Sequence, residues 1–231
     1  MATRCVQLSL DLFSPSRWGG RRAGAGRKPG LIRRDPHRRR TPLAARHPCH
    51  VTVRVRKDVP SLRRARFIGE MEVSFRQACE RGRFRLVLFS IQTNHVHLIV
   101  EAASASDLAS GMKSIGSRLA RAVNRIFGRT GPVLADRYHL HVLRTPREVR
   151  NAIAYVLMNA RRHAAKLGRR LSREAGIDPA SSGRWFDGWR TSRAQRAAQD
   201  PPAVALARSW LLRIGWRRAG LIEPWEVPGH R

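Results

Sequence analysis

The sequence predicts an α+β fold: a ferredoxin-like βαββαβ antiparallel sheet with an additional C-terminal helix that carries a tyrosine. Two observations predict it. Short segments alternate between apolar and polar residues, as strands do, and longer segments repeat apolar residues every three or four positions, as helices do. These segments follow one another in the order of a split βαβ arrangement. At 231 residues, we expect a basic, disordered arm (1–46), one domain (47–167) and a C-terminal extension (168–231) without an assigned role.

The first half of the predicted domain is strand, helix, strand, strand. Residues 51–56 alternate as a half-buried strand does. Asp58 and Pro60 are expected to open a helix. Its apolar residues fall on one face: Phe67, Met71, Phe75 and Cys79. Residues 84–91 are almost continuously apolar, which predicts a central strand, and residues 95–101 form the next strand.

The second half of the predicted domain is helix, strand, helix. Six apolar residues mark a long amphipathic helix: Leu108, Met112, Ile115, Leu119, Val123 and Ile126. Residues 138–144 form the last strand, and Thr145 with Pro146 caps the last helix. Its inward residues are Val149, Ala152, Ile153, Val156, Leu157 and Ala160. We expect the helices on one sheet face, the other face free for a site or partner, and a further helix at about 203–214 in the extension.

The chain is strongly basic. It has 46 lysine and arginine residues against 16 aspartate and glutamate residues, a formal net charge of +30. Such an excess implies a polyanionic partner, because each neutralised phosphate of a nucleic acid releases condensed counterions. GC-rich coding explains arginine in place of lysine, but it does not explain basic in place of acidic residues. We therefore expect a nucleic-acid-binding protein.

Cysteine usage and hydropathy exclude other classes. Cys5, Cys49 and Cys79 are widely spaced and odd in number, so neither a disulfide framework nor a zinc knuckle is indicated. No apolar run reaches the roughly 18 residues of a membrane span, and the N-terminus lacks the apolar core of a signal peptide. We expect no membrane association and a cytoplasmic, nucleoid-associated location in a prokaryotic cell.

Nine basic residues are expected to contact DNA. The arm is rich in glycine and arginine and poor in apolar residues, so it is either a flexible phosphate-binding arm, which we favour, or a solubilising tail. The predicted contacts lie in the arm and in the domain: Arg21, Arg22, Arg27, Lys28, Arg118, Arg121, Arg125, Arg137 and Arg144.

The strongest local motif is Asn94-His95-Val96-His97. Alternate side chains of a strand share a face, so His95 and His97 point the same way, about 6–7 Å apart by strand rise. Two imidazoles so placed can close on one metal ion; two surface or stacking histidines are the alternative. A second pair of the same form, His139 and His141, lies nearer the sheet edge, and we interpret it as DNA-facing or structural.

Tyr155 is one of only two tyrosines, Tyr138 being the other. It lies on the last predicted helix, off the buried stripe, and Asn159 falls one turn later on the same face. A phenol beside an amide oxygen, facing two strand histidines, is a plausible nucleophile beside a third metal ligand. The alternatives are an amphipathic rim tyrosine and a solvated asparagine.

The stretch from His50 to about His163 resembles the transposase domain of single-tyrosine HUH enzymes. It is especially similar to the REP-associated tyrosine transposases. The resemblance rests on four segments in the right order and spacing, which are residues 50–55, 94–98, 131–139 and 155–159. The glycine- and arginine-rich arm is also similar to that group.

The resemblance implies roles for four residues. His95 and His97 would be the histidine ligands, Asn159 the polar ligand and Tyr155 the nucleophile. The metal would be Mg²⁺ or Mn²⁺, the substrate single-stranded or hairpin DNA, and the product a 5′-phosphotyrosine with a free 3′-hydroxyl. Relatives often have proline after the asparagine, where this chain has Ala160. In relatives the tyrosine acts within one subunit or across a dimer, so a homodimer stays open.

Two rival functions stay open. One is a catalytically inactive, domesticated DNA-binding protein, against which the retention of all four site residues argues. The other is an RNA-binding ferredoxin-like module, which would read bases with aromatic residues on its central strands. Histidines stand there in this sequence, which disfavours the RNA-binding alternative.

Overall fold

The computed structural model describes residues 42–169, 171–172, 176–191 and 200–229. Its strands and α-helices are β1 (Cys49–Arg54), α1 (Ala65–Arg76), β2 (Glu80–Arg81), β3 (Phe84–Ile91), β4 (His95–Ala102), α2 (Ala105–Ile126), β5 (His139–Val142), α3 (Pro146–Leu157), α4 (Asn159–Lys166) and α5 (Trp210–Arg213). Most of the predicted arm lies outside the described residues, and so do its four predicted DNA contacts, which are Arg21, Arg22, Arg27 and Lys28.

The sheet has the predicted topology. Its strand order is β2-β3-β4-β1-β5, and every paired neighbour is antiparallel. The elements β1, α1, β3, β4, α2 and β5 make the βαββαβ unit. Strand β2 is an addition that forms a short hairpin with β3. The α+β, ferredoxin-like prediction is therefore confirmed.

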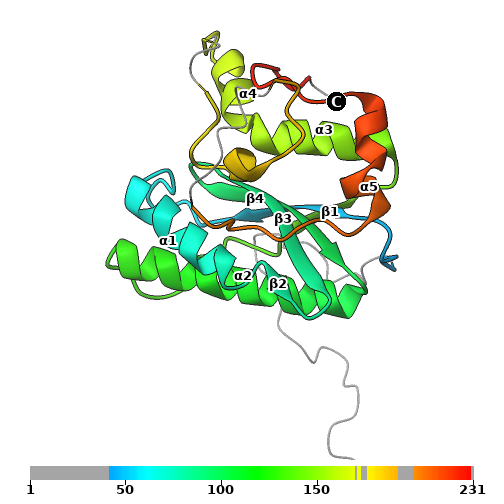
Figure 1. Ribbon diagram of the computed structural model, residues 1–231. Helices are drawn as coiled ribbons and strands as arrows, with labels where there is room; N and C mark the ends of the chain where they lie inside the picture. The colour runs from blue at the N-terminus through cyan, green and yellow to red at the C-terminus, as the bar shows by residue number, and fades with distance from the viewer. Residues whose placement is uncertain (1–41, 170, 173–175, 192–199, 230–231) are drawn as a thin grey trace, which may run out of the picture. The chain divides into compact units, whose positions relative to one another are not determined.

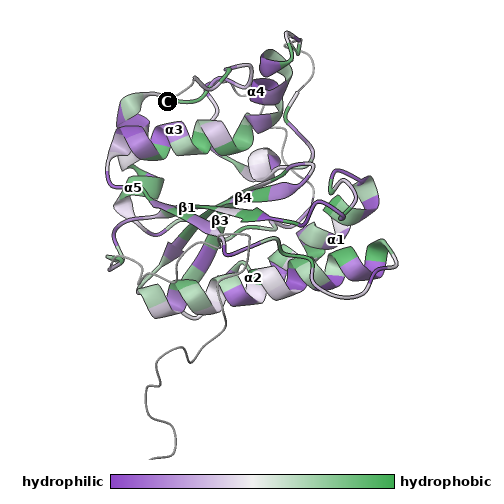
Figure 2. Ribbon diagram, turned by 180° about the vertical axis from the view of Figure 1, so that it is seen from behind, coloured by the Kyte–Doolittle hydropathy of each residue, from purple (hydrophilic) through white to green (hydrophobic). Residues whose placement is uncertain are grey.

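Helices cover both faces of the sheet, whereas we predicted that one face would be free (Figure 1). On one face α1 and α2 pack against a core that contains Val51, Leu98 and Phe89. On the opposite face α3 packs with Leu88 and Ile99. The prediction of a free face was wrong because the apolar stripe of α3 needs a partner, and this face of β3 and β4 supplies it. Figure 2 shows the amphipathic helices with both hydrophilic and hydrophobic residues around their circumference.

Strand β3 contains a β-bulge at Val87, within its run of four apolar residues from Leu86 to Phe89. In the β3–β4 register Leu86 pairs with Val100 and Leu88 with Ile99, so Val87 is an extra residue. The bulge shifts the alternation by one position, which lets Val87 and Leu88 both join the core beneath α3. The continuous apolar run predicted a buried central strand, and all eight residues of β3 are buried.

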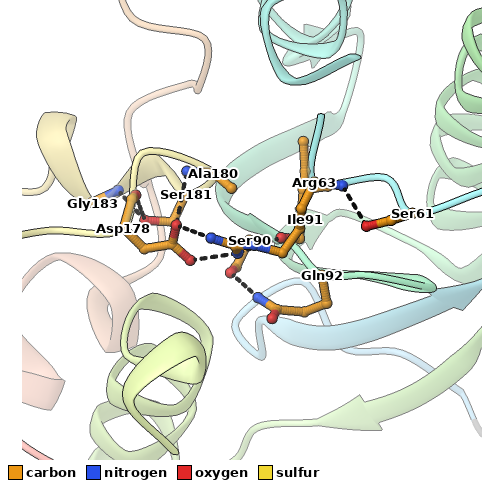
Figure 3. A network of polar contacts seen from close by, with 9 residues as sticks. All are labelled: Ser61, Arg63, Ser90, Ile91, Gln92, Asp178, Ala180, Ser181 and Gly183. Carbon is orange, nitrogen blue, oxygen red and sulfur yellow. Dashed lines mark hydrogen bonds and ion pairs between the residues drawn. The ribbon is translucent and has the colours of Figure 1, made fainter. Parts of the chain in front are cut away.

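The C-terminal extension completes the fold. Ile91 N donates to Ala180 O, and the Ser182 hydroxyl bonds both backbone groups of Phe89, so residues 180–182 continue the sheet beside β3. The Arg63 guanidinium donates two hydrogen bonds, of 2.8 and 2.9 Å, to the Asp178 carboxylate (Figure 3). This contact ties the extension to the segment that precedes α1.

Further along the extension, the buried Glu101 carboxylate accepts the backbone N–H groups of Arg208 and Ser209. The fully buried Trp216 packs in the core beneath α3. The extension therefore covers the edge of β3 that does not pair with β4, and part of the sheet face on which α3 packs.

Two predicted boundaries of the first helix were wrong. It begins at Ala65 and not at Asp58 or Pro60, because the backbone N–H of Leu62 donates to Thr93 O, in the turn before β4, and not to a carbonyl within a helix. It ends at Arg76, so Cys79 lies beyond it. There the carbonyl of Cys79 accepts Leu86 N and starts the β2–β3 pairing.

Two later helices also differ from prediction. The last core helix is interrupted at Met158 (φ −102°, ψ 19°), so α3 and α4 are separate. The helix expected at 203–214 is reduced to α5, because the backbone N–H of Ala205 donates to Leu86 O and not to a carbonyl within a helix. Trp210 in α5 and Ile214 just after it are 46% and 52% exposed.

None of the helices in the described ranges has the length and apolar character needed to cross a membrane.

The Arg63–Asp178 pair should contribute measurably to stability. Asp178 has a side chain only 6% exposed, and its carboxylate also accepts Ala180 N. We expect Asp178→Ala to lower the free energy of unfolding by about 1–3 kcal/mol, because it leaves these donors without an acceptor. Urea denaturation measures this. The matched control is Asp187→Ala, whose carboxylate is 82% exposed opposite Arg217 and should cost at most about 1 kcal/mol. Equal losses in the two variants would contradict the assigned role.

Candidate functional site

The candidate site lies on the sheet face that α3 partly covers. In the β1–β4 register His97 stands opposite Thr52 and His95 opposite Arg54. Side chains alternate along a strand, so both histidines point to this face. Val96 and Leu98 point to the opposite face and are buried in the core beneath α1 and α2. The predicted division of this strand into a histidine face and an apolar face is what the structure shows.

The two histidines converge. Their Nε2 atoms are 3.0 Å apart, and the rings meet edge to face with centroids 4.6 Å apart. His97 is 4% exposed, whereas His95 at the start of β4 is partly open to solvent. Side-chain torsions thus bring the ring nitrogens much closer than the strand rise of about 6–7 Å between their backbones.

The last turn of α3 brings Tyr155 to the histidines. Its ring lies edge-on to those of His97 and His50, with centroid distances of 5.1 and 5.6 Å. The guanidinium of Arg162 lies 4.7 Å from the centre of the same ring, a cation–π contact. Tyr155 is half-buried, while Ile153 on the same helix is fully packed in the core.

Asn159 is the first residue of α4 and is fully buried. Neither its amide oxygen nor its amide nitrogen has a hydrogen-bond partner within the described structure. His163 lies one helical turn later, and its ring is 6.4 Å from that of His95, so this face of α4 looks toward the histidines. An unsatisfied buried amide costs about 1–3 kcal/mol unless something binds it. The interruption at Met158 means that Tyr155 and Asn159 belong to two helices, not to one face of a continuous helix.

Four further residues contact the site, and none of them was predicted from the sequence to have a role in it. Asn94 Oδ1 is 2.7 Å from His95 Nδ1. His97 Nδ1 has two neighbours, Thr52 Oγ1 at 3.1 Å and His50 Nε2 at 3.2 Å. The fourth is Arg162. Alternation along β1 puts His50 and Thr52 on one face, but only the strand register shows that this is the face of His97.

Burial keeps the histidines neutral. It lowers the pKa of His97 to about 2, with the nearby His50 and His95 as further causes. Burial likewise lowers the pKa of His95 to about 4, assisted by the charge of Arg54. The pKa of His50 is lowered to about 4, first by burial and then by His141 and His139. A neutral imidazole has a lone pair with which to bind a cation.

Residues 45–155 match the family described as "Transposase IS200 like". These residues are similar to an IS200-like transposase domain. The match begins just before β1 and ends at Tyr155, so it contains both histidines of the pair. No curated protein matches the chain.

Three solved structures are similar to this chain in backbone arrangement. A REP-associated tyrosine transposase bound to a REP hairpin has a TM-score of 0.43 at 16% identity, over 58% of this chain and 74% of that one. A putative transposase from Deinococcus radiodurans R1 has 0.36 at 13%, over 49% and 87%. A bacterial tRNA(His) guanylyltransferase-like protein in complex with ATP has 0.38 at 10%, over 75% and 76%.

The donor set of the transposase domain fits a metal ion. Six-coordinate ligands with bonds of about 2.1 Å at right angles lie about 3.0 Å apart, and the two Nε2 atoms have that separation. The buried amide of Asn159, which has no hydrogen-bond partner in the described part of the chain, would supply a third donor. Among the described residues no three histidine, cysteine, aspartate or glutamate side chains form a metal-binding group. Two imidazoles suit Mn²⁺ better than Mg²⁺.

A pocket of about 470 Å³ opens beside Tyr155, with His50, His141, Arg150 and Arg162 among its walls. His139 and His141, the second pair, are exposed on β5 on the same sheet face as His50. They border the site and take no part in the convergence of His95 and His97.

The other predicted DNA contacts in the transposase domain are dispersed. Arg137 and Arg144 are exposed beside the two ends of β5. Arg118, Arg121 and Arg125 lie on α2, which covers the opposite sheet face from the histidines. Arg125 forms an ion pair with Glu70 there. The structure therefore brings together His95, His97, Tyr155 and the helix face of Asn159, and leaves these arginines on other surfaces.

The lowered histidine pKa values predict a loss of stability in mild acid. In the unfolded chain His97 has a pKa of about 6.5, so it binds a proton as the pH falls below that value, whereas buried His97 in the folded chain stays neutral. The free energy of unfolding therefore falls as the pH drops from 7 to 5. Urea denaturation with metal removed measures this slope. His97→Gln should flatten it, and His139→Gln, an exposed control, should not. The assignment is wrong if the two variants change the slope equally.

Proposed function

We propose that this transposase is a metal-dependent endonuclease and strand transferase for single-stranded DNA, with Tyr155 as its nucleophile. The single observation that carries the proposal is the contact of the Tyr155 ring with His97, whose Nε2 meets that of His95. A nucleophile and two cation ligands thus share one site. Family membership supplies the class of reaction, and the geometry supports these residues for it.

The reaction is an in-line displacement at phosphorus. The Tyr155 oxygen loses its proton to solvent, which reaches the half-buried side chain, and forms a bond to phosphorus. The bond from phosphorus to the 3′ oxygen breaks, and that oxygen takes up a proton. The products are a 5′-phosphotyrosine and a free 3′-hydroxyl. Attack by a 3′-hydroxyl on this linkage reverses the bond changes, so rejoining needs no nucleotide cofactor.

Each side chain has a task in this scheme. The Arg162 guanidinium, which lies over the Tyr155 ring, would donate hydrogen bonds to the oxygens of an approaching phosphate. His95, His97 and Asn159 would hold Mn²⁺ or Mg²⁺. The ion, when bound, polarises the phosphate and stabilises the leaving oxygen. The pocket beside Tyr155 would admit the nucleotide next to the cut.

The charge of +30 supports DNA as the partner, and a single-stranded hairpin is the first substrate to test. A catalytically inactive DNA-binding relative is the competing proposal. That competitor would retain affinity for the hairpin and form no covalent product.

Replacement of the nucleophile separates these two functions. Tyr155→Phe should abolish the SDS-resistant adduct with a labelled hairpin and leave binding affinity within about twofold, because only the hydroxyl is lost. Tyr138→Phe, the other tyrosine, is the matched control and should form the adduct normally. An adduct from the Tyr155 variant would transfer the role to another residue, and none from the wild-type protein under any metal would favour the DNA-binding function.

Metal binding should depend on the convergent pair. His97→Ala removes a ligand at the centre of the site and Asn159→Ala removes the buried amide, so both should weaken Mn²⁺ binding at least tenfold and stop cleavage. Calorimetric titration measures the affinity. His139→Ala on the exposed strand β5 should bind Mn²⁺ like the wild-type protein. Loss confined to His139 or His141 variants would mean that the edge pair is the ligand pair.

A further inference from the structure

The Nδ1 atoms of both candidate ligands face hydrogen-bonding partners that lie on the side away from the convergent Nε2 atoms. His95 Nδ1 is 2.7 Å from Asn94 Oδ1. His97 Nδ1 is 3.1 Å from Thr52 Oγ1 and 3.2 Å from His50 Nε2. A neutral imidazole carries one N–H and one lone pair, so the partner at Nδ1 decides what Nε2 can do.

For His95 the partner allows one arrangement. A carboxamide oxygen accepts hydrogen bonds and cannot donate them. The proton of His95 therefore lies on Nδ1, which donates to Asn94 Oδ1, and Nε2 keeps its lone pair. Asn94 itself is held in the turn before β4, where its carbonyl accepts the backbone N–H of Val55.

For His97 the contacts allow two arrangements. If its proton lies on Nδ1, it donates to Thr52 or His50, and the Nε2 lone pair faces that of His95 at 3.0 Å. Two lone pairs at this distance repel unless a cation lies between them. If Thr52 instead donates to Nδ1, the proton lies on Nε2 and donates to His95. His97 then has no lone pair for a cation.

We propose that Asn94, Thr52 and His50 are positioning residues that set the tautomers of His95 and His97, so that both Nε2 lone pairs are presented to one cation. The inference rests on the proposed function for the identity of the two ligands. Because Asn94 accepts the Nδ1 proton of His95, the Nε2 lone pair of His95 is available to a cation even before the cation binds. The pair Thr52 and His50 offers His97 two acceptors, which favours the ligating tautomer when the cation arrives.

The first test reads the tautomers directly. In the full chain with ¹⁵N-labelled histidine, long-range ¹H–¹⁵N spectra distinguish protonated Nδ1 from protonated Nε2. His95 should carry its proton on Nδ1 in metal-free protein and with Mg²⁺ present, and His97 should carry it on Nδ1 when Mg²⁺ is bound. Assignment uses the His95→Gln and His97→Gln variants. A His95 proton on Nε2 in the metal-free protein would overturn the inference without any reference to cleavage.

The second test measures Mn²⁺ affinity by the paramagnetic resonance signal of the free ion. Asn94→Ala should weaken binding about 10- to 100-fold, the usual effect of losing a partner of a metal-bound histidine. Asn94→Asp keeps an oxygen acceptor and should bind at least as tightly as the wild-type protein. Thr52→Val keeps the branched shape and should cost less, since His50 still accepts. The double variant Thr52→Val with His50→Phe should lose as much as Asn94→Ala, and Thr52→Ser should match the wild-type protein.

Tyr138→Phe, which leaves every Nδ1 partner in place, serves as the reference and should bind Mn²⁺ normally. Wild-type affinity in both Asn94→Ala and the double variant would overturn the positioning role while leaving the metal site of the proposed function intact. Failure of the wild-type protein to bind Mn²⁺ would instead contradict the metal site itself. In that case the metal-free spectrum still decides the role of Asn94.

Discussion

The antiparallel register of β1 and β4 is the constraint on which the site depends. It sets Thr52 opposite His97 and aligns the alternating side chains of both strands on common faces. A slip by one residue would turn the histidines into the core and the valines of β4 outward, so burial of Val96 and Leu98 specifies the register strongly. The same apolar packing that stabilises the sheet therefore fixes where the imidazoles point. Apolar packing on one face of the sheet thus positions the histidine side chains on the other face.

The second face of the sheet is divided between packing and chemistry. The apolar stripe of α3 lies over Leu88 and Ile99, and its last turn ends beside the histidines. Tyr155 is thus partly buried between the site and a core cluster, which includes Trp216 from the C-terminal extension. The extension packs against the helix that carries Tyr155. It is held by Asp178, which pairs with Arg63 before α1, and by Glu101 of β4, which accepts the backbone N–H of Arg208. The interruption at Met158 then turns the chain so that Asn159 begins a separate helix.

Much of this architecture could be predicted from local pattern. Alternation in 51–56 and 95–101, the spacing of Leu108 to Ile126, and the Thr145–Pro146 cap each determine an element by themselves. The pairing of His95 with His97 follows from strand geometry alone. The start of α1 and the reduction of the helix near 203–214 could not be predicted, because single long-range backbone hydrogen bonds, from Leu62 and Ala205, replace hydrogen bonds within a helix. Residues His50 and Thr52 entered the site only through the register of two strands 40 residues apart, which no local pattern contains.

The central claim is that Tyr155 becomes covalently joined to DNA. The chain has two tyrosines, and cleavage after arginine puts them in different peptides, residues 138–144 and 151–161. The most direct measurement is tandem mass spectrometry of the adduct formed with a single-stranded hairpin and Mn²⁺, after digestion with trypsin and nuclease. The account predicts a nucleotide on peptide 151–161, attached at Tyr155 through a 5′-phosphate. A nucleotide on peptide 138–144, or one attached to a residue other than tyrosine, would contradict it.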